Sequence, residues 1–192
     1  GGFDVVVASH AGAVYGHGFG GVWRDIPAVA GRAAAGDAAG VIARHREICH
    51  FHLESRDADY LAELREAMKA TGITLDMLLI DDGDLTAPDI DHQLAWYDAW
   101  LDAAAALGAR RARIGAGRSA PTSERLACSG RHLAQLAERH PRVRIVTENW
   151  LEMTPDADSV LALLDVAGPH VGLLIDLGNW RGAEKYAGLE RI

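Results

Sequence analysis

Short apolar runs alternate along this chain with longer segments of helical periodicity, and this alternation limits the possible folds more than any other feature. The runs cover residues 4–9, 48–53, 74–80, 111–115, 143–148 and 171–176. Several are continuously apolar, which is typical of parallel strands covered on both faces. A repeated order of strand then helix produces a parallel sheet. The sequence therefore predicts an α/β fold of six βα units, and 192 residues are compatible with a single domain.

The segments between the runs carry helix signals. Helices are expected over residues 57–70, 88–107, about 123–139, and from 155 onward. Thr122 or Ser123 is the expected N-cap of the third helix, and Gly108 ends the second as a C-terminal glycine. Thr154 followed by Pro155 predicts the start of the fourth, because proline fits the first helical position.

Residues 10–45 differ in composition from the rest. The stretches "GHGFGG" and "GRAAAGDAAG" are rich in glycine and alanine and have weak periodicity. Glycines cost backbone entropy on folding and offer few apolar anchors. We expect a long loop after the first strand and a poorly defined helix near residues 28–45, with residues 15–40 the least regular part of the fold.

Two carboxylates stand where apolar runs stop. Glu148 ends the run in "VRIVTENW", and Asp176 ends the run in "VGLLIDLGNW". The carboxyl ends of parallel strands meet at one edge of the sheet, where α/β proteins bind ligands. Two buried carboxylates at one edge repel each other unless a proton or cation compensates, and a divalent metal ion suits oxygen and nitrogen ligands. The alternative is that both carboxylates cap the helices that follow them.

Other polar and aromatic residues are candidates for substrate contacts. Asn179 follows a glycine that permits a sharp turn, so it could point back over the strand end and bind a substrate hydroxyl; alternatively it is an Asx-turn residue. Trp150 is an aromatic neighbour of Glu148. His10 ends the first apolar run. His50 and His52 could share one strand face, and packing or a substrate contact is favoured for them over a metal-ligand pair.

The sequence also predicts positions for Arg113 and for the acidic stretch at residues 81–85. Arg113 could reach the same strand end as the carboxylates. The stretch "DDGDL" at residues 81–85 lacks the spacing of an EF-hand loop and is expected to be a solvated turn.

Composition excludes some classes of function. The net charge of −8 argues against a general electrostatic interaction with nucleic acid. No apolar run reaches the length of a membrane span, and no signal peptide is visible. Two cysteines in unrelated contexts are typical of free thiols in a reducing compartment, so a cytoplasmic location is expected.

The stretches "DADYLAELREAMKATGITLDMLLID", "DAAAALGARRARIGAG", "VRIVTENW" and "VGLLIDLGNW" together resemble the xylose isomerase-like TIM-barrel superfamily, in particular its sugar-phosphate isomerase/epimerase branch. The resemblance spans roughly residues 48–192. It implies a TIM-barrel-like fold with Glu148 and Asp176 at the ends of the fifth and sixth strands, where the family binds its metal. It also implies a divalent ion (Mn, Mg, Co or Zn) as cofactor and a sugar or sugar phosphate as substrate.

The chemistry implied by the resemblance is proton transfer between sugar carbons. The metal stabilises an enediolate-like state while a carboxylate removes the proton. By resemblance, Glu148 is a ligand and the base, Asp176 a ligand, and Asn179 a substrate-binding residue. His10, His52 and Trp150 are further candidates for substrate contacts, and Trp150 replaces a histidine that is frequent in the family.

The family's barrel has eight strands and draws further ligands from the last two, whereas this chain supplies six. We therefore expect either a partial chain or completion by another chain, including a homo-oligomer. A sugar-binding or assembly subunit without catalysis is the main alternative function. An apurinic-site endonuclease is a further one, which the acidic charge disfavours.

Overall fold

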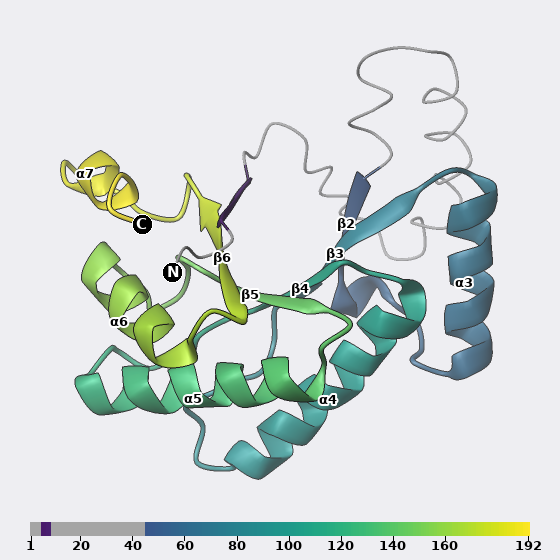
Figure 1. The fold of residues 1–192 in the computed structure, drawn as a ribbon, viewed down its shortest axis with the longest axis horizontal. Coiled ribbons are helices and arrows are strands. Elements are labelled where there is room, and N and C mark those ends of the chain that lie inside the picture. Colours follow the sequence, from purple (N-terminus) through teal and green to yellow (C-terminus); the bar gives the residue numbers. More distant parts are fainter. Residues whose placement is uncertain (1–4, 9–44) are drawn as a thin grey trace.

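The computed structural model describes the backbone of residues 5–8 and 45–192, and side chains from Glu47 onward (Figure 1). Six parallel strands form one sheet: β1 (Val5–Ala8), β2 (His45–Cys49), β3 (Thr74–Ile80), β4 (Arg111–Ile114), β5 (Arg144–Glu148) and β6 (Val171–Asp176). From β2 onward the strands alternate with helices on the chain, which confirms the predicted TIM-barrel-like α/β fold as a partial barrel.

The sheet order is β1-β6-β5-β4-β3-β2. Strands β2 to β6 are neighbours in chain order, as in a barrel. Strand β1 instead pairs in parallel with β6, from Val5 opposite Leu173 to Ala8 opposite Asp176. This pairing satisfies the backbone groups along one side of β6, so β1 and β2 form the edges of the sheet.

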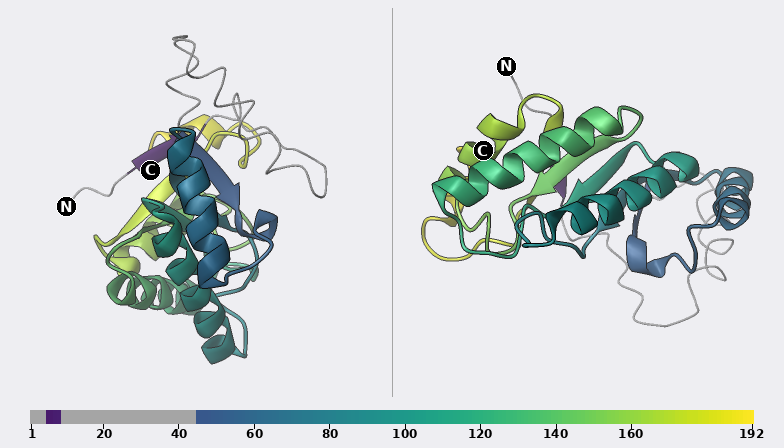
Figure 2. Two further views of the ribbon diagram at one scale, coloured as in Figure 1. Left: turned by 90° about the vertical axis from the view of Figure 1, so that its right-hand side faces the viewer. Right: turned by 90° about the horizontal axis from the view of Figure 1, so that it is seen from below.

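The helices are α3 (Ala58–Ala70), α4 (Ile90–Leu107), α5 (Ser123–Arg139), α6 (Ala157–Ala167) and α7 (Lys185–Leu189), with a short 3-10 helix, η2 (His50–His52). Helices α4, α5 and α6 lie on one side of the sheet, and α5 packs against α6 (Figures 1 and 2). None of the helices in the described residues has the length and apolar character that a membrane crossing would require.

Alternation along the strands separates two apolar clusters. The main core lies between the sheet and the helices and includes Leu173 and Ile175 of β6. Leu174, between these two residues, instead joins a small cluster with Met77 and Val146. The face that carries this small cluster is the inner face of the partial barrel. Because Glu148 and Asp176 keep the alternation of Val146 and Leu174, they extend this inner face to the carboxyl ends of the strands, which we call the rim.

Several predicted element ends are confirmed. Strands β3 and β6 have the expected bounds. Thr122 caps α5 by accepting a hydrogen bond from the backbone N–H of Arg125 at 3.2 Å. Gly108 ends α4 in the left-handed region, with φ of 78°.

Two local predictions are wrong. The strand expected over residues 48–53 runs instead over His45–Cys49, where its pairing with β3 ends opposite Leu79, and the chain turns at once into η2. Thr154 does not cap α6. The helix begins two residues beyond Pro155, and the carboxylate of Asp156 accepts from the backbone N–H of Ser159 at 2.8 Å.

Some predictions fall on residues that the structure does not describe. These are the irregular segment 15–40, the helix near 28–45, and His10 at the end of the first strand.

Candidate active site

Glu148 and Asp176 lie at the rim on neighbouring strands. They are the last residues of β5 and β6, and their exposed fractions are 4% and 6%. The residues before them, 145–147 of β5 and 171–175 of β6, are all buried, so burial of the strands carries the carboxylates into the protein. A buried carboxylate is costly unless it is paired or hydrogen-bonded.

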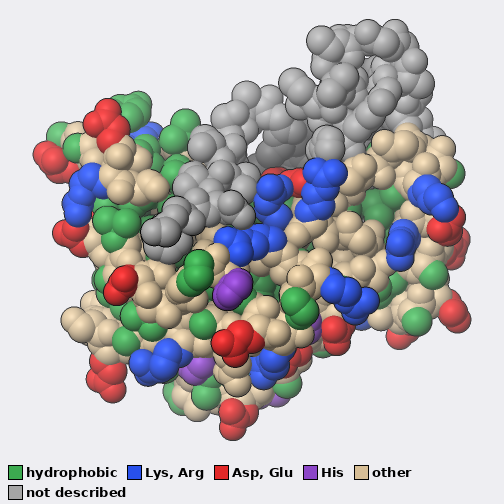
Figure 3. Space-filling model, viewed as in Figure 1, with side chains coloured by type: hydrophobic (Ala, Val, Ile, Leu, Met, Phe, Trp, Pro, Cys, Tyr) green, Lys and Arg blue, Asp and Glu red, His purple; other side chains and the backbone are tan. Residues whose placement is uncertain are grey.

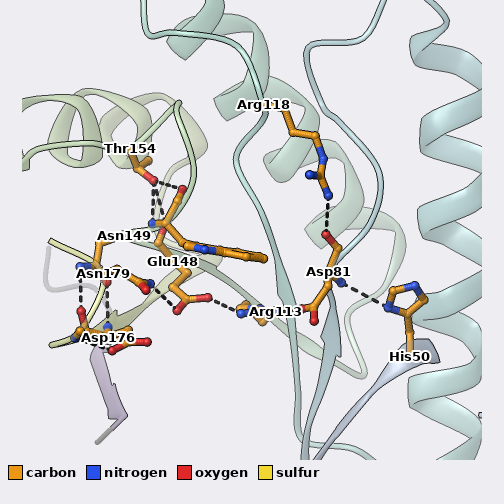
Figure 4. A network of polar contacts seen from close by, with 11 residues as sticks. His50, Asp81, Arg113, Arg118, Glu148, Asn149, Thr154, Asp176 and Asn179 are labelled. Carbon is orange, nitrogen blue, oxygen red and sulfur yellow. Dashed lines mark hydrogen bonds and ion pairs between the residues drawn. The ribbon is translucent and has the colours of Figure 1, made fainter. Parts of the chain in front are cut away.

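Both carboxylate oxygens of Glu148 have partners (Figure 4). Oε2 forms an ion pair with Nη1 of Arg113, and Oε1 accepts a hydrogen bond from Nδ2 of Asn179 at 2.9 Å. The expected turn at Gly178 therefore brings Asn179 back over the end of β5. A carboxylate has about four acceptor positions. Two donors fix its orientation and leave acceptor capacity for a ligand.

Arg113 connects Glu148 to a second carboxylate. Its Nη2 forms an ion pair with Asp81, which directly follows β3. The guanidinium also lies over the ring of Trp150, with 4.8 Å between Cζ and the ring centroid. The solvated turn expected at residues 81–85 is therefore wrong for Asp81, whereas the side chain of Asp82 is 68% exposed.

His50 ends the network on the β2 side (Figure 4). Its Nδ1 accepts from the backbone N–H of Asp81 at 3.3 Å, and its Nε2 lies 3.3 Å from a carboxylate oxygen of Asp82. Burial beside Trp96 and Trp100 lowers the pKa of His50, while Asp82 opposes this shift. Both ring nitrogens already have partners, so His50 serves as a packed link between Asp81 and Asp82.

His52 does not continue the strand face of His50, because both residues belong to η2 rather than to β2. Its ring contacts that of Phe51 edge-on, with centroids 4.5 Å apart. Phe51 is 58% exposed. His50, not His52, joins the polar network at the rim.

Asn149 joins the ends of β5 and β6. Its Oδ1 accepts from the backbone N–H of Asp176 at 2.7 Å, and its Nδ2 donates to the carbonyl of Asp176 at 3.0 Å. The carboxylate of Asp176 accepts from the backbone N–H of Gly178 at 2.6 Å. These contacts fix the relative position of the two strand ends beyond their backbone pairing.

The turn after β5 places Trp150. The hydroxyl of Thr154 accepts from the backbone N–H of Trp150 at 3.0 Å and lies 3.0 Å from the carbonyl of Glu148. Within this turn Leu151 has a φ of 65°, a conformation that costs energy in a residue other than glycine. The cross-linked turn holds the indole of Trp150 against Arg113.

The described residues offer the kind of ligand that a divalent cation prefers, but too few ligands to hold one. Glu148 and Asp176 supply carboxylate oxygens, which hard divalent ions prefer. Among residues 47–192, however, no group of three or more His, Cys, Asp or Glu side chains could hold a metal ion. The positive charge expected beside Glu148 comes from Arg113. These residues therefore provide at most two of the ligands that such an ion requires.

The chain matches the family described as "Xylose isomerase-like TIM barrel" over residues 30–191. The chain belongs to this family. This confirms the resemblance that the strand-end motifs indicated. No curated protein sequence matches the chain.

Solved structures with the same fold include enzymes of several kinds. The probable 3-DHS dehydratase AsbF from Bacillus anthracis has a TM-score of 0.62 at 16% identity, over 81% of this chain and 57% of that one. A D-tagatose 3-epimerase-like protein has a TM-score of 0.57 at 18% identity, over 71% and 57%. A sugar phosphate isomerase/epimerase from Parabacteroides distasonis has a TM-score of 0.60 at 10% identity, over 81% and 60%. The chain thus spans less than two thirds of each of these structures.

Charged side chains of both signs lie on the described part of the face in Figure 3.

Proposed function

We propose that this chain forms the catalytic rim of a metal-dependent sugar or sugar-phosphate isomerase/epimerase. The observation that carries the proposal is Glu148, a buried carboxylate at the end of β5 whose oxygens are oriented by Arg113 and Asn179. A carboxylate held in this way, next to Asp176, is suited to act as a general base.

In the proposed reaction Glu148 removes a proton from a sugar carbon next to a carbonyl group. In an isomerisation Glu148 returns this proton to the former carbonyl carbon, and a second proton moves from the hydroxyl oxygen to the former carbonyl oxygen. In an epimerisation Glu148 keeps the proton, and an acid outside the described residues donates another to the opposite face of the same carbon. Asn179, already a donor to Glu148, is close enough to bind a substrate hydroxyl. The indole of Trp150 offers an apolar face to the sugar ring. His10 and His52 are further proposed substrate contacts from the first and second units.

The metal is part of the same proposal. A divalent ion (Mn, Mg, Co or Zn) would be held by Glu148 and Asp176, with further ligands from outside the described residues. When bound, it would polarise the sugar oxygens and so acidify the neighbouring C–H bond. A second copy of this chain or another chain could supply those ligands.

The names of the similar structures support this reaction class. An epimerase-like protein, a sugar phosphate isomerase/epimerase and a probable dehydratase share the fold. Isomerisation, epimerisation and many dehydrations all begin with loss of a proton next to a carbonyl group. At 10–18% identity the fold alone is shared, so the substrate class is inferred from the family and from the carboxylate site.

The test is solvent-deuterium incorporation by the full-length protein that carries this chain. A panel of ketoses and ketose phosphates is incubated in D₂O with Mn²⁺, Mg²⁺, Co²⁺ or Zn²⁺, and exchange is followed by NMR. We expect exchange at one carbon next to the carbonyl, dependent on added metal. Sugar binding without exchange would support a binding subunit instead. The absence of both sugar binding and exchange would overturn the proposal.

A further inference from the structure

Arg113 is bound on three sides by residues from three different elements. Asp81 follows β3, Glu148 ends β5, and Trp150 lies in the turn after β5. The guanidinium lies between the two carboxylates in the close view (Figure 4). Only 7% of Arg113 is exposed, so these contacts are shielded from water. Shielding strengthens the ion pairs and raises the cost of losing one partner.

The position of Arg113 on β4 explains this reach. Arg113 lies opposite Val146 in the register of β4 and β5, so it shares the inner face with Glu148, two residues nearer the rim on β5. Its side chain therefore extends toward the rim to meet Glu148. The planar guanidinium presents one Nη group to each carboxylate, a geometry that a lysine ammonium cannot reproduce.

We propose that Arg113 is a positioning residue that fixes the carboxylate of Glu148, and that Asp81 acts only through Arg113. The proposal relies on the proposed function in one respect, namely that Glu148 is the base. Asn179 and Arg113 hold one oxygen each, so loss of Arg113 frees the carboxylate to rotate about its last side-chain bonds. A misplacement of about 1 Å can lower a rate about 100-fold.

The proposal predicts that the effect of Asp81→Asn on the melting temperature changes sign when Arg113 is replaced. With Arg113 present, Asp81 is a favourable partner, and Asp81→Asn should lower the melting temperature by about 5 °C. Without Arg113, Asp81 and Glu148 are two carboxylates that share a poorly solvated site, and like charges repel. In the Arg113→Met background, Asp81→Asn should therefore raise the melting temperature.

Arg111 provides the matched control. It lies on the same strand and the same face, with Nη1 2.7 Å from Oδ2 of Asp76, but at the opposite end of β4. Arg111→Met should lower the melting temperature by about 2–4 °C, because its ion pair is more exposed. It should leave the contact between Glu148 and Asn179 intact.

The first readout needs no activity. Melting temperatures are measured for Arg113→Met and Asp81→Asn, alone and together, and the crystal structure of Arg113→Met is determined. We expect the sign reversal and loss of the contact between Glu148 and Asn179. If Asp81→Asn lowers the melting temperature equally in both backgrounds, or if Glu148 stays in place without Arg113, the proposal is wrong.

The second readout is the exchange reaction. Arg113→Met should lower kcat about 100-fold and change KM about threefold or less, since the lost interaction orients the base rather than the substrate. Arg113→Lys should recover most of the melting temperature but less than about a tenth of kcat, because its charge lacks the planar fork. An unchanged kcat in Arg113→Met would refute the positioning role. If the wild type shows no exchange, the proposed function fails, while the first readout still decides whether Arg113 orients Glu148.

Discussion

Two arginines on β4 occupy opposite ends of the same inner face. Arg113 pairs with Glu148 at the rim, where the side chains are 9% and 5% exposed. Arg111 pairs with Asp76 at the amino-terminal end of the strands, the base, where they are 32% and 19% exposed. The chemical groups are the same, but the number of partners and the access of water differ.

The difference separates a partly exposed ion pair from a buried one. At the base, water reaches both partners, and Arg110 lies 3.9 Å from Asp76 as a second cation. Such partly exposed pairs contribute about 0–1 kcal/mol. At the rim, one arginine pairs with two carboxylates and lies over the ring of Trp150. In TIM barrels the rim carries function and the base carries stability.

The largest expected contrast is between the effects of replacing Glu148 at the rim and Asp76 at the base on the exchange rate. Glu148→Gln keeps the shape but removes the proposed base and a ligand charge, so it should lower the exchange rate about 10²–10⁴-fold. Asp76→Asn at the base should change the rate less than about threefold, because it is remote from the rim. Both rates are measured by deuterium incorporation at saturating sugar and metal. Full exchange by Glu148→Gln would move the base elsewhere.

Metal titration sharpens the same contrast. Asp176→Asn keeps the hydrogen-bonding shape and removes one proposed ligand charge, so it should raise the Kd for Mn²⁺ about tenfold or more. Excess Mn²⁺ should restore part of the exchange rate. Asp76→Asn should leave the Kd unchanged. Calorimetric titration checks this, and equal Mn²⁺ affinity in Asp176→Asn and the wild type would remove Asp176 from the ligand set.

The strands β5 and β6 are also linked at both ends, which gives a third contrast. At the rim, the fully buried amide of Asn149 makes two hydrogen bonds to the backbone of Asp176. Asn149→Ala leaves a buried N–H and C=O of Asp176 without those partners and should cost about 2–4 kcal/mol of unfolding free energy. At the base, Arg144 donates to the carbonyl of Pro169 at 2.9 Å in an exposed contact.

Urea denaturation of Asn149→Ala and Arg144→Ala measures this contrast. Arg144→Ala should cost about 1 kcal/mol or less, because water can replace its exposed hydrogen bond. Equal costs for the two variants would show that burial does not distinguish rim from base at this strand pair.

The sequence predicts most of the rim because strand ends are local features. Strand β6 is a continuous apolar run, so its last residue and the placement of Asp176 follow from hydrophobicity alone. Glu148 ends the run 143–148 in a similar way, although that run also contains Arg144 and Thr147. Arg113 is expected to reach the same strand end, and its ion pair with Glu148 confirms this. The metal role of the carboxylates stays a prediction.

The missed residues depend on contacts that are distant in sequence. Asp81 lies in a run of carboxylates that resembles a solvated turn, and the run does not reveal its ion pair with Arg113, 32 positions away. Its position directly after an apolar run, like that of Glu148, was a usable signal. The end of β2 depends on its register with β3. A single sequence does not state that register.

The smallest expected effect concerns His50, at the β2 side of the rim. Burial lowers its pKa from the ordinary 6.5, so the folded state binds a proton less readily than the unfolded state. Above about pH 6.5 both states hold neutral His50, and its contribution to stability is complete. As the pH falls below 6.5 toward the lowered pKa, the unfolded state takes up the proton first, and stability is lost.

His50→Asn removes this titration and retains a side-chain acceptor for the backbone N–H of Asp81. The difference in unfolding free energy between wild type and His50→Asn should therefore shrink as the pH falls from 7.5 to 5.5. The titration of the carboxylates is common to both proteins and cancels in this difference. Urea denaturation at the two pH values measures it. A difference that grows at pH 5.5 would mean that Asp82 holds a protonated His50 in the folded protein, and that the rim carries a second cation beside Arg113.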